Sequence, residues 1–214
     1  MTTALETIRR LRIVPLIVID DPAKADPLAR ALVEGGLPCA EIAFRTAGAL
    51  EALRRMATGH PEVLVGAGTV LDAAQAAAAR EAGARFIVSP GLNPRVVEFC
   101  LGHDLPVFPG VCTPTEIGAA MDLGLRVLKF FPAEPMGGLP YLQAVAAPFG
   151  AAEFIPTGGI TASHLPAYLA FRRVLACGGS WMATQAWIEA GAFDRIAVET
   201  RQAMWLAHPQ AEEG

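Results

Sequence analysis

Eight short runs of apolar, mostly β-branched residues recur along the chain, and segments rich in alanine and leucine separate most of them. Successive runs start about 20–27 residues apart, which suits a compact unit of one strand and one helix. The intervening segments, such as PLARALVEGG (27–36), have helical periodicity and end in glycine, a common helix stop. The runs span residues 13–19, 39–44, 63–68, 85–89, 105–110, 126–131, 153–158 and 173–179.

Alternating strands and helices predict an α/β fold with a parallel sheet, and eight such units predict closure into a (β/α)8 TIM barrel. Residues 1–12 precede the first strand, and we expect them to form a helix that caps the N-terminal end of the barrel. A doubly wound open sheet is the main alternative. It usually carries a glycine fingerprint after its first strand, and residues 13–29 contain no glycine. We therefore expect one barrel domain over residues 1–214.

The composition excludes several classes of protein. Hydrophobic residues make up 53% of the chain, which fits a sheet buried on both faces, but no apolar stretch reaches the length of a membrane span. The net charge of −4 and the dispersed arginines argue against nucleic acid or a membrane as partner. The histidines show no metal-ligand spacing, so we expect no metal. The cysteines are widely separated, and we expect them to be free thiols in a reducing compartment, as in a cytoplasmic protein. The cysteines are Cys39, Cys100, Cys112 and Cys177.

A lysine interrupts the sixth apolar run, RVLKFF (126–131). The chain has only two lysines, Lys24 and Lys129, and its other long cationic side chains are arginines. Lys129 could extend to solvent or pair with Glu41 or Glu134. Alternatively, an amine in a partly desolvated pocket favours its neutral form and becomes a nucleophile toward carbonyl carbons. The position and the apolar neighbours favour this second interpretation.

The second run and the two residues after it, CAEIAFRT (39–46), carry a carboxylate and an arginine four residues apart. Glu41 and Arg45 would share one face of a strand. A buried carboxylate is unfavourable unless it is paired or neutralised. The pair is therefore either a structural ion pair or a general base beside an arginine that binds substrate.

Other polar or glycine residues follow the predicted strands at the end where such barrels carry their chemistry. Thr69 follows the third strand and either binds an anion or caps the next helix. SPG (89–91) follows the fourth strand and indicates a turn. PTGGIT (156–161) and ACGGSW (176–181) each contain a Gly-Gly pair, and the loops after strands seven and eight often bind phosphate through backbone N–H groups. The alternative for both pairs is a tight turn that needs positive φ.

Together these residues suit imine chemistry on a phosphorylated keto acid. Lys129 would attack the ketone, and the protonated imine would act as an electron sink while a carbon–carbon bond breaks. Arg45 and Thr69 would bind the carboxylate of the substrate. Glu41 would move protons, directly or through water.

The segments EIAFRT, GAGTVL, SPG, KFFPAE, PTGGI and GGSW resemble the signature segments of the 2-keto-3-deoxy-6-phosphogluconate (KDPG) aldolase family. This family is also known for 4-hydroxy-2-oxoglutarate (KHG) aldolase activity. The resemblance runs from about Ile13 to the final helix. It implies a (β/α)8 barrel, usually a homotrimer, that needs no cofactor and cleaves KDPG to pyruvate and glyceraldehyde 3-phosphate.

The resemblance also implies a role for each matching residue. Lys129 is expected to form the Schiff base, and Glu41 is expected to be the acid/base. The residues expected at the pyruvate end and near the hydroxylated carbons are Arg45, Thr69, Pro90, Phe131 and Thr157. The residues expected to bind phosphate are Gly158, Gly159, Gly178, Gly179 and Ser180.

Three rival functions remain open at this point. The aldolase for the galactonate epimer is the nearest, and Arg45-Thr46 and Thr157 favour the gluconate type over it, although one pocket can accept both epimers. A metal-dependent aldolase of class II is the second. A catalytically silent barrel that binds phosphorylated sugars is the third, and it predicts the loss of Lys129 or Glu41, both of which are present.

Overall fold

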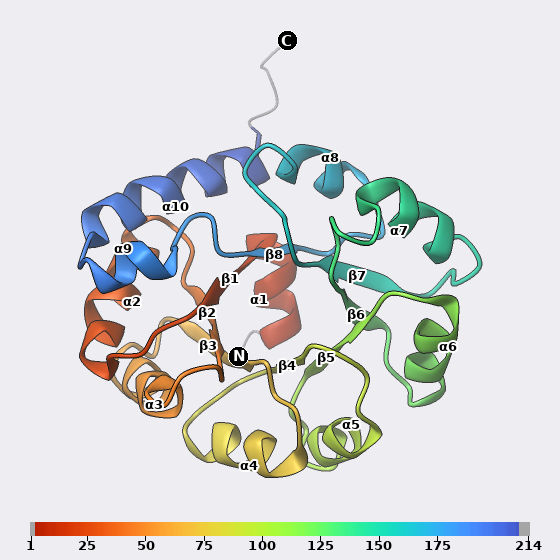
Figure 1. Cartoon of the computed structure of the whole chain (residues 1–214), viewed down its shortest axis with the longest axis horizontal. Coiled ribbons are helices and arrows are strands. Elements are labelled where there is room, and N and C mark those ends of the chain that lie inside the picture. The colour runs from red at the N-terminus through yellow and green to blue at the C-terminus, as the bar shows by residue number, and fades with distance from the viewer. Residues whose placement is uncertain (1–2, 210–214) are drawn as a thin grey trace.

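The computed structural model describes residues 3–209 and alternates strands with helices along the chain (Figure 1). The strands are β1 (Ile13–Ile17), β2 (Cys39–Ala43), β3 (Leu64–Gly68), β4 (Ile87–Ser89), β5 (Val107–Val111), β6 (Val127–Phe130), β7 (Glu153–Pro156) and β8 (Cys177–Gly179). The helices are α1 (Ala4–Leu11), the 3-10 turn η1 (Pro22–Lys24), α2 (Ala25–Glu34), α3 (Ala49–Gly59), α4 (Ala73–Glu81), α5 (Pro94–Leu101), α6 (Pro114–Asp122), α7 (Gly138–Ala146), α8 (Leu165–Ala170), α9 (Gln185–Glu189) and α10 (Phe193–Ala207).

All eight strands are parallel and closed into a barrel. The hydrogen-bonded order runs from β7 back through β1 to β8, and the bridges Phe154–Val174 and Thr157–Gly178 join the two edges. The helices other than α1 form a ring outside the strands (Figure 1). The predicted (β/α)8 barrel is therefore confirmed, and the open doubly wound alternative is wrong.

The eighth strand is shorter than its apolar run. The run covers residues 173–179, whereas β8 begins at Cys177 because Val174 forms an isolated bridge with Phe154 of β7 that does not continue into the strand. Gly178 and Gly179 lie inside this strand, where they pair with Val14 and Pro15 of β1. The prediction that both Gly-Gly pairs follow their strands is thus correct for Gly158–Gly159 only.

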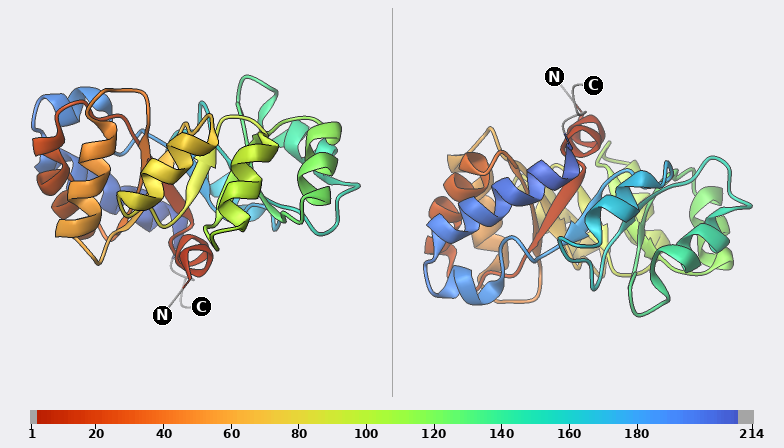
Figure 2. Two further views of the ribbon diagram at one scale, coloured as in Figure 1. Left: turned by 90° about the horizontal axis from the view of Figure 1, so that it is seen from below. Right: turned by 90° about the horizontal axis from the view of Figure 1, so that it is seen from above.

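Helix α1 covers the N-terminal end of the barrel, as the sequence predicts (Figure 2). Thr3 and Glu6 form a capping box that satisfies free N–H groups of the first turn. On the other side of the helix, Ile8 and Leu11 are buried against the barrel. This apolar plug leaves the opposite end of the barrel, where the strands finish, as the end open to ligands.

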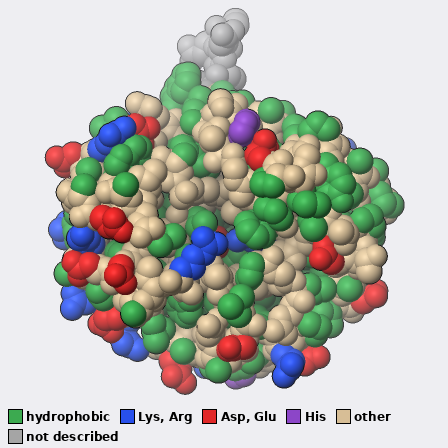
Figure 3. Space-filling model, viewed as in Figure 1, with side chains coloured by type: hydrophobic (Ala, Val, Ile, Leu, Met, Phe, Trp, Pro, Cys, Tyr) green, Lys and Arg blue, Asp and Glu red, His purple; other side chains and the backbone are tan. Residues whose placement is uncertain are grey.

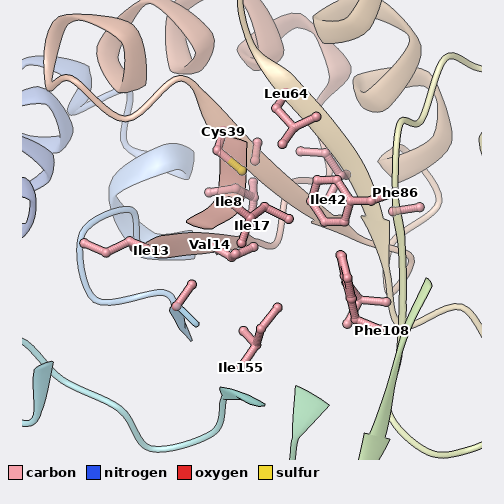
Figure 4. Close-up of a cluster of buried hydrophobic side chains, with 14 of the residues drawn as sticks. Ile8, Ile13, Val14, Ile17, Cys39, Ile42, Leu64, Phe86, Phe108 and Ile155 are labelled. Carbon is pink, nitrogen blue, oxygen red and sulfur yellow. The ribbon is translucent and has the colours of Figure 1, made fainter. Parts of the chain in front are cut away.

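The core fills the barrel interior and the layer between strands and helices. Figure 4 shows part of it, with side chains from α1, β1, β2, β3, β5 and β7. Three of the four cysteines belong to this core, and burial raises the pKa of the Cys100 thiol to about 11. Within residues 3–209 no helix is long and apolar enough to cross a membrane.

Candidate active site

Lys129 lies inside the barrel, buried among apolar side chains. Strand β6 places it between Gly110 of β5 and Ile155 of β7. Its side chain is only 6% exposed, so the interpretation in which it extends to solvent is wrong. Its Nζ lies 5.1 Å from the ring centre of Phe131, which follows at the end of the strand. Lys129 therefore has the desolvated surroundings that the sequence predicts.

Glu41 is the partner of Lys129. Strand β2 is buried along its whole length, and Glu41 is 2% exposed. Its Oε1 lies 3.5 Å from Nζ of Lys129. The carboxylate fits because residue 68 is glycine, since a Cβ there would overlap the Glu41 side chain. Of the alternatives for Lys129, the contact with Glu41 is confirmed, and Glu134 contacts other residues instead.

The contact between Lys129 and Glu41 is long for a charge-assisted hydrogen bond, which is usually about 2.7–2.9 Å. Catalytic hydrogen bonds are often long before the substrate binds. A cavity of about 10 Å³ adjoins the two groups, close to the smallest space that can hold a water. At a separation of 3.5 Å, the Lys129 and Glu41 side chains are within direct reach of each other. The cavity is lined by Val14, Glu41, Phe86, Val88, Phe108, Lys129, Ile155 and Thr157.

Arg45 follows β2 and is exposed, and it binds Thr69 rather than Glu41. Its Nε donates a 3.2 Å hydrogen bond to Oγ1 of Thr69. Among the ion pairs of the described residues, none involves Arg45, so the structural Glu41–Arg45 pair is wrong. Thr69 does not cap the next helix either, because Asp72 caps α4. Thr69 has φ of 58°, an unfavourable conformation for a β-branched residue that strained functional sites often contain.

A second, larger cavity of about 390 Å³ opens at the same end of the barrel. Thr157 lines both cavities, so they adjoin each other. The space-filling view of this end shows basic side chains beside a hollow near its centre (Figure 3). The larger cavity is lined by Leu16, Arg45, Phe131, Thr157, Gly158, Gly159, Ile160, Thr161, Gly179, Ser180 and Trp181.

The two Gly-Gly pairs are glycine for different reasons. Gly158 and Gly159 have φ of 102° and 79°, so the turn after β7 needs positive φ. Gly178 and Gly179 need close approach instead, since a Cβ would overlap Thr157 and Trp181 respectively. In the described part of the chain, the backbone N–H groups of Gly159 and Ser180 donate to no protein acceptor. These N–H groups are therefore free to bind an anion.

Comparison with known proteins agrees with this geometry. The family model for KDPG and KHG aldolase matches residues 5–198.

The chain belongs to this aldolase family.

Relatives and solved structures extend the match over nearly the full chain. The chain is 47% identical to a 2-dehydro-3-deoxy-phosphogluconate aldolase of Treponema pallidum, over 96% of this chain and 98% of the relative. It is 44% identical to the KHG/KDPG aldolase of Escherichia coli, over 90% of each. Among structures, KDPG aldolase from Legionella pneumophila, with pyruvate captured as a covalent carbinolamine, superposes with a TM-score of 0.90 at 33% identity. That match covers 94% of this chain and 98% of the Legionella chain.

The KDPG and KHG aldolase family is of class I and does not use a metal. Within residues 3–209 no group of three or more metal-binding side chains occurs. The class II alternative is wrong because the chain belongs to this family. The buried lysine beside a carboxylate is what imine chemistry requires.

Most of the residues predicted from the sequence gather at this aldolase site, with a few differences. Thr69 and Pro90 lie at the same end of the barrel but line neither cavity, and Thr69 reaches the site only through its hydrogen bond with Arg45. Gly178 contributes through its contact with Thr157. Sequence reasoning did not name Leu16, Ile160, Thr161 and Trp181 as residues of the larger cavity. The two-residue alternation along β1 could have placed Leu16 inside. The other three lie in the PTGGIT and ACGGSW segments, beside the glycines that the sequence assigns to the site.

Proposed function

We propose that this chain cleaves KDPG to pyruvate and glyceraldehyde 3-phosphate through an imine on Lys129. The observation that carries the proposal is the buried Lys129 Nζ, which lies 3.5 Å from the Glu41 carboxylate at the open end of a barrel. An amine needs an apolar environment to favour its nucleophilic neutral form, and it needs a nearby group to take and return protons. Both requirements are met at this one place.

The reaction steps assign a task to each of the two groups. Lys129 attacks the ketone carbon and gives a carbinolamine, which loses water to form the imine. The positively charged imine then accepts the electron pair of the breaking carbon–carbon bond, the proton of the hydroxyl on the leaving carbon passes to Glu41, and glyceraldehyde 3-phosphate leaves. Glu41 moves the protons at the carbinolamine and at the enamine, which becomes pyruvate after hydrolysis.

We propose that Arg45 and Thr69 bind the carboxylate of the keto acid. The hydrogen bond from Arg45 Nε to Thr69 Oγ1 orients the guanidinium, whose remaining donors can form a forked contact with a carboxylate. Phe131 packs beside Lys129 on one side of the imine. Pro90 belongs at the pyruvate end by family resemblance alone.

The phosphate of the substrate would bind at the other end of the larger cavity. Gly158, Gly159, Gly179 and Ser180 line it, and the free N–H groups of Gly159 and Ser180 support this assignment. Gly178 would act by leaving room for Thr157. Thr157 lies between the two cavities, where the hydroxylated carbons of the substrate would pass.

The remaining features of the proposal concern selectivity and assembly. Activity on KHG or on the galactonate epimer would use the same imine, and only the contacts around Thr157 would differ. We propose a single domain over residues 1–214 that works as a cytoplasmic homotrimer, without a metal or other cofactor and without a nucleic acid or membrane partner. The family resemblance supports the trimer.

A steady-state comparison tests the proposed substrate. Pyruvate release would be measured with KDPG, with its galactonate epimer and with KHG, each with and without a metal chelator. We expect the highest kcat/KM for KDPG and no effect of the chelator. A higher kcat/KM for either of the other substrates would contradict the proposed substrate, and loss of activity with the chelator would contradict the imine mechanism.

A further inference from the structure

A second polar cluster lies beside the proposed phosphate site and has no part in the mechanism above. It is centred on Glu134, in the loop after β6. The hydroxyl of Tyr168, on α8, donates a 2.5 Å hydrogen bond to Glu134 Oε1. The other carboxylate oxygen, Oε2, lies 3.8 Å from Nε2 of His164, the residue before α8. The cluster therefore connects the loop after β6 with the start of α8.

The cluster contacts both ends of the segment formed by residues 158–161, which we call the phosphate loop. At one end, the backbone N–H of Glu134 donates a 3.0 Å hydrogen bond to the carbonyl of Gly158. At the other end, the N–H of Thr161 donates a 3.3 Å hydrogen bond to Nδ1 of His164. A Cβ on Gly159 would lie 2.7 Å from the Cβ of Glu134, so the loop packs directly on this residue.

The hydrogen-bond directions are consistent along the cluster. Since His164 Nδ1 accepts from Thr161, the hydrogen of a neutral imidazole is on Nε2, which faces Glu134. Burial, and then the hydrogen bond to Glu134, raise the pKa of Tyr168, so this hydroxyl remains a donor. Both oxygens of the carboxylate therefore face hydrogen-bearing groups.

The cluster lies behind the phosphate loop rather than inside the proposed substrate cavity. Glu134, His164 and Tyr168 line a separate hollow of about 250 Å³, and none of the three lines the 390 Å³ cavity. A carboxylate would repel a phosphate if the two were in contact. The cluster can therefore affect phosphate only through the loop that separates them.

We propose that Glu134, Tyr168 and His164 are positioning residues that hold the phosphate loop in its binding conformation and so set the affinity for phosphorylated substrate. This inference rests on the proposed function. A loop held in place before binding loses less conformational entropy when the phosphate arrives. The effect should appear in the binding of phosphate and leave imine formation with pyruvate unchanged.

The test is the substitution Tyr168→Phe, which removes only the hydroxyl. We expect the KM for KDPG and the inhibition constant of inorganic phosphate each to rise about fivefold to tenfold, as for the loss of one typical hydrogen bond. The kcat and the borohydride trapping of pyruvate should change less than about twofold. Glu134 is 31% exposed, so water can replace the lost donor and the variant should fold.

The chain provides a matched control in Tyr141, its only other tyrosine. The Tyr141 ring packs against Phe130 at 6.1 Å between centres, and among the described residues its hydroxyl has no hydrogen-bond partner. Tyr141→Phe should leave the KM, the phosphate inhibition and the trapping unchanged. If Tyr168→Phe leaves both phosphate constants unchanged, or impairs pyruvate trapping equally, the positioning role is wrong.

A pair of substitutions at Glu134 gives a second test. The amide of Glu134→Gln can still accept from Tyr168, whereas Glu134→Ala cannot, so we expect a larger rise in KM for the alanine variant. Equal KM values for the two variants and the wild type would overturn the inference. Cleavage of KDPG by the wild-type protein distinguishes the proposed function from the proposed positioning role. Failure to cleave KDPG would contradict the proposed function, whereas cleavage with unchanged KM in all variants would contradict the positioning role alone.

Discussion

At the scale of single residues, the chemistry depends on two buried groups that must not be fully paired with each other. Lys129 and Glu41 are 5% and 2% exposed, yet their contact of 3.5 Å is longer than a strong ion pair. A tight pair would hold the lysine as an ammonium and block its attack on a ketone. At 3.5 Å the Glu41 carboxylate is close enough to exchange protons with the groups that form on Lys129 during the reaction.

Glu41→Gln tests the role of the carboxylate. An amide cannot take up the proton, so we expect kcat for KDPG cleavage to fall about 10²- to 10⁴-fold, the usual contribution of a general acid–base group. The dissociation constant for pyruvate should change much less. Steady-state cleavage and pyruvate titration give the two quantities. Equal losses in both would mean that Glu41 is a structural partner of Lys129.

The sequence predicts these two residues well and their neighbours less well. A charged residue in an apolar strand stands out from local pattern alone, so Lys129 and Glu41 could be found without coordinates. The bond from Arg45 to Thr69 could not, because it joins residues 24 positions apart after different strands. The positive φ of Thr69 also has no signal in the sequence, since threonine rarely adopts it.

At the scale of elements, the strand pattern was sufficient for the architecture but not for every boundary. Strand β8 begins at Cys177 although its apolar run starts at residue 173, because the first residues of the run form only an isolated bridge with Phe154 of β7. Periodicity cannot distinguish a continuous strand from an isolated bridge of this kind. The two glycines of β8, Gly178 and Gly179, are part of the ladder with β1.

The N-terminal helix is attached to the barrel by an ion pair between elements far apart in sequence. Arg9 of α1 donates two hydrogen bonds, of 2.8 and 2.7 Å, to the carboxylate of Glu153 at the start of β7. The hydrogen bonds from Arg9 hold the pKa of Glu153 below its usual value of 4.5. A carboxyl whose pKa is lowered by folding stabilises the folded state above its unfolded pKa. It loses that contribution as the pH falls through its folded pKa.

Arg9→Gln should therefore lower the free energy of unfolding at pH 7 by about 0.5–1 kcal/mol, as for a partly exposed pair. The difference from wild type should shrink as the pH falls below 4.5 toward the lowered pKa of Glu153. Urea unfolding at a series of pH values measures it. Arg10→Gln is the control, since Arg10 is also exposed on α1. A difference that persists at the lowest pH would show that Arg9 acts without Glu153.

At the scale of the whole molecule, barrel closure brings the site together from distant parts of the chain. Glu41 comes from β2 and Lys129 from β6, which lie four strands apart in the sheet order. The sequence predicts this meeting only through the closed barrel, since an open sheet would hold the two strands apart. The adjoining cavities then offer space for both ends of an elongated substrate.

The most direct test of the account is to incubate the protein with pyruvate and borohydride and to locate the reduced adduct by peptide mass spectrometry. The chain has two lysines, so the result is unambiguous. We predict one adduct, on Lys129, that is absent in Lys129→Ala and unaffected in Lys24→Ala. No adduct with the wild-type protein, or an adduct that persists in Lys129→Ala, would contradict the central claim that Lys129 forms the imine.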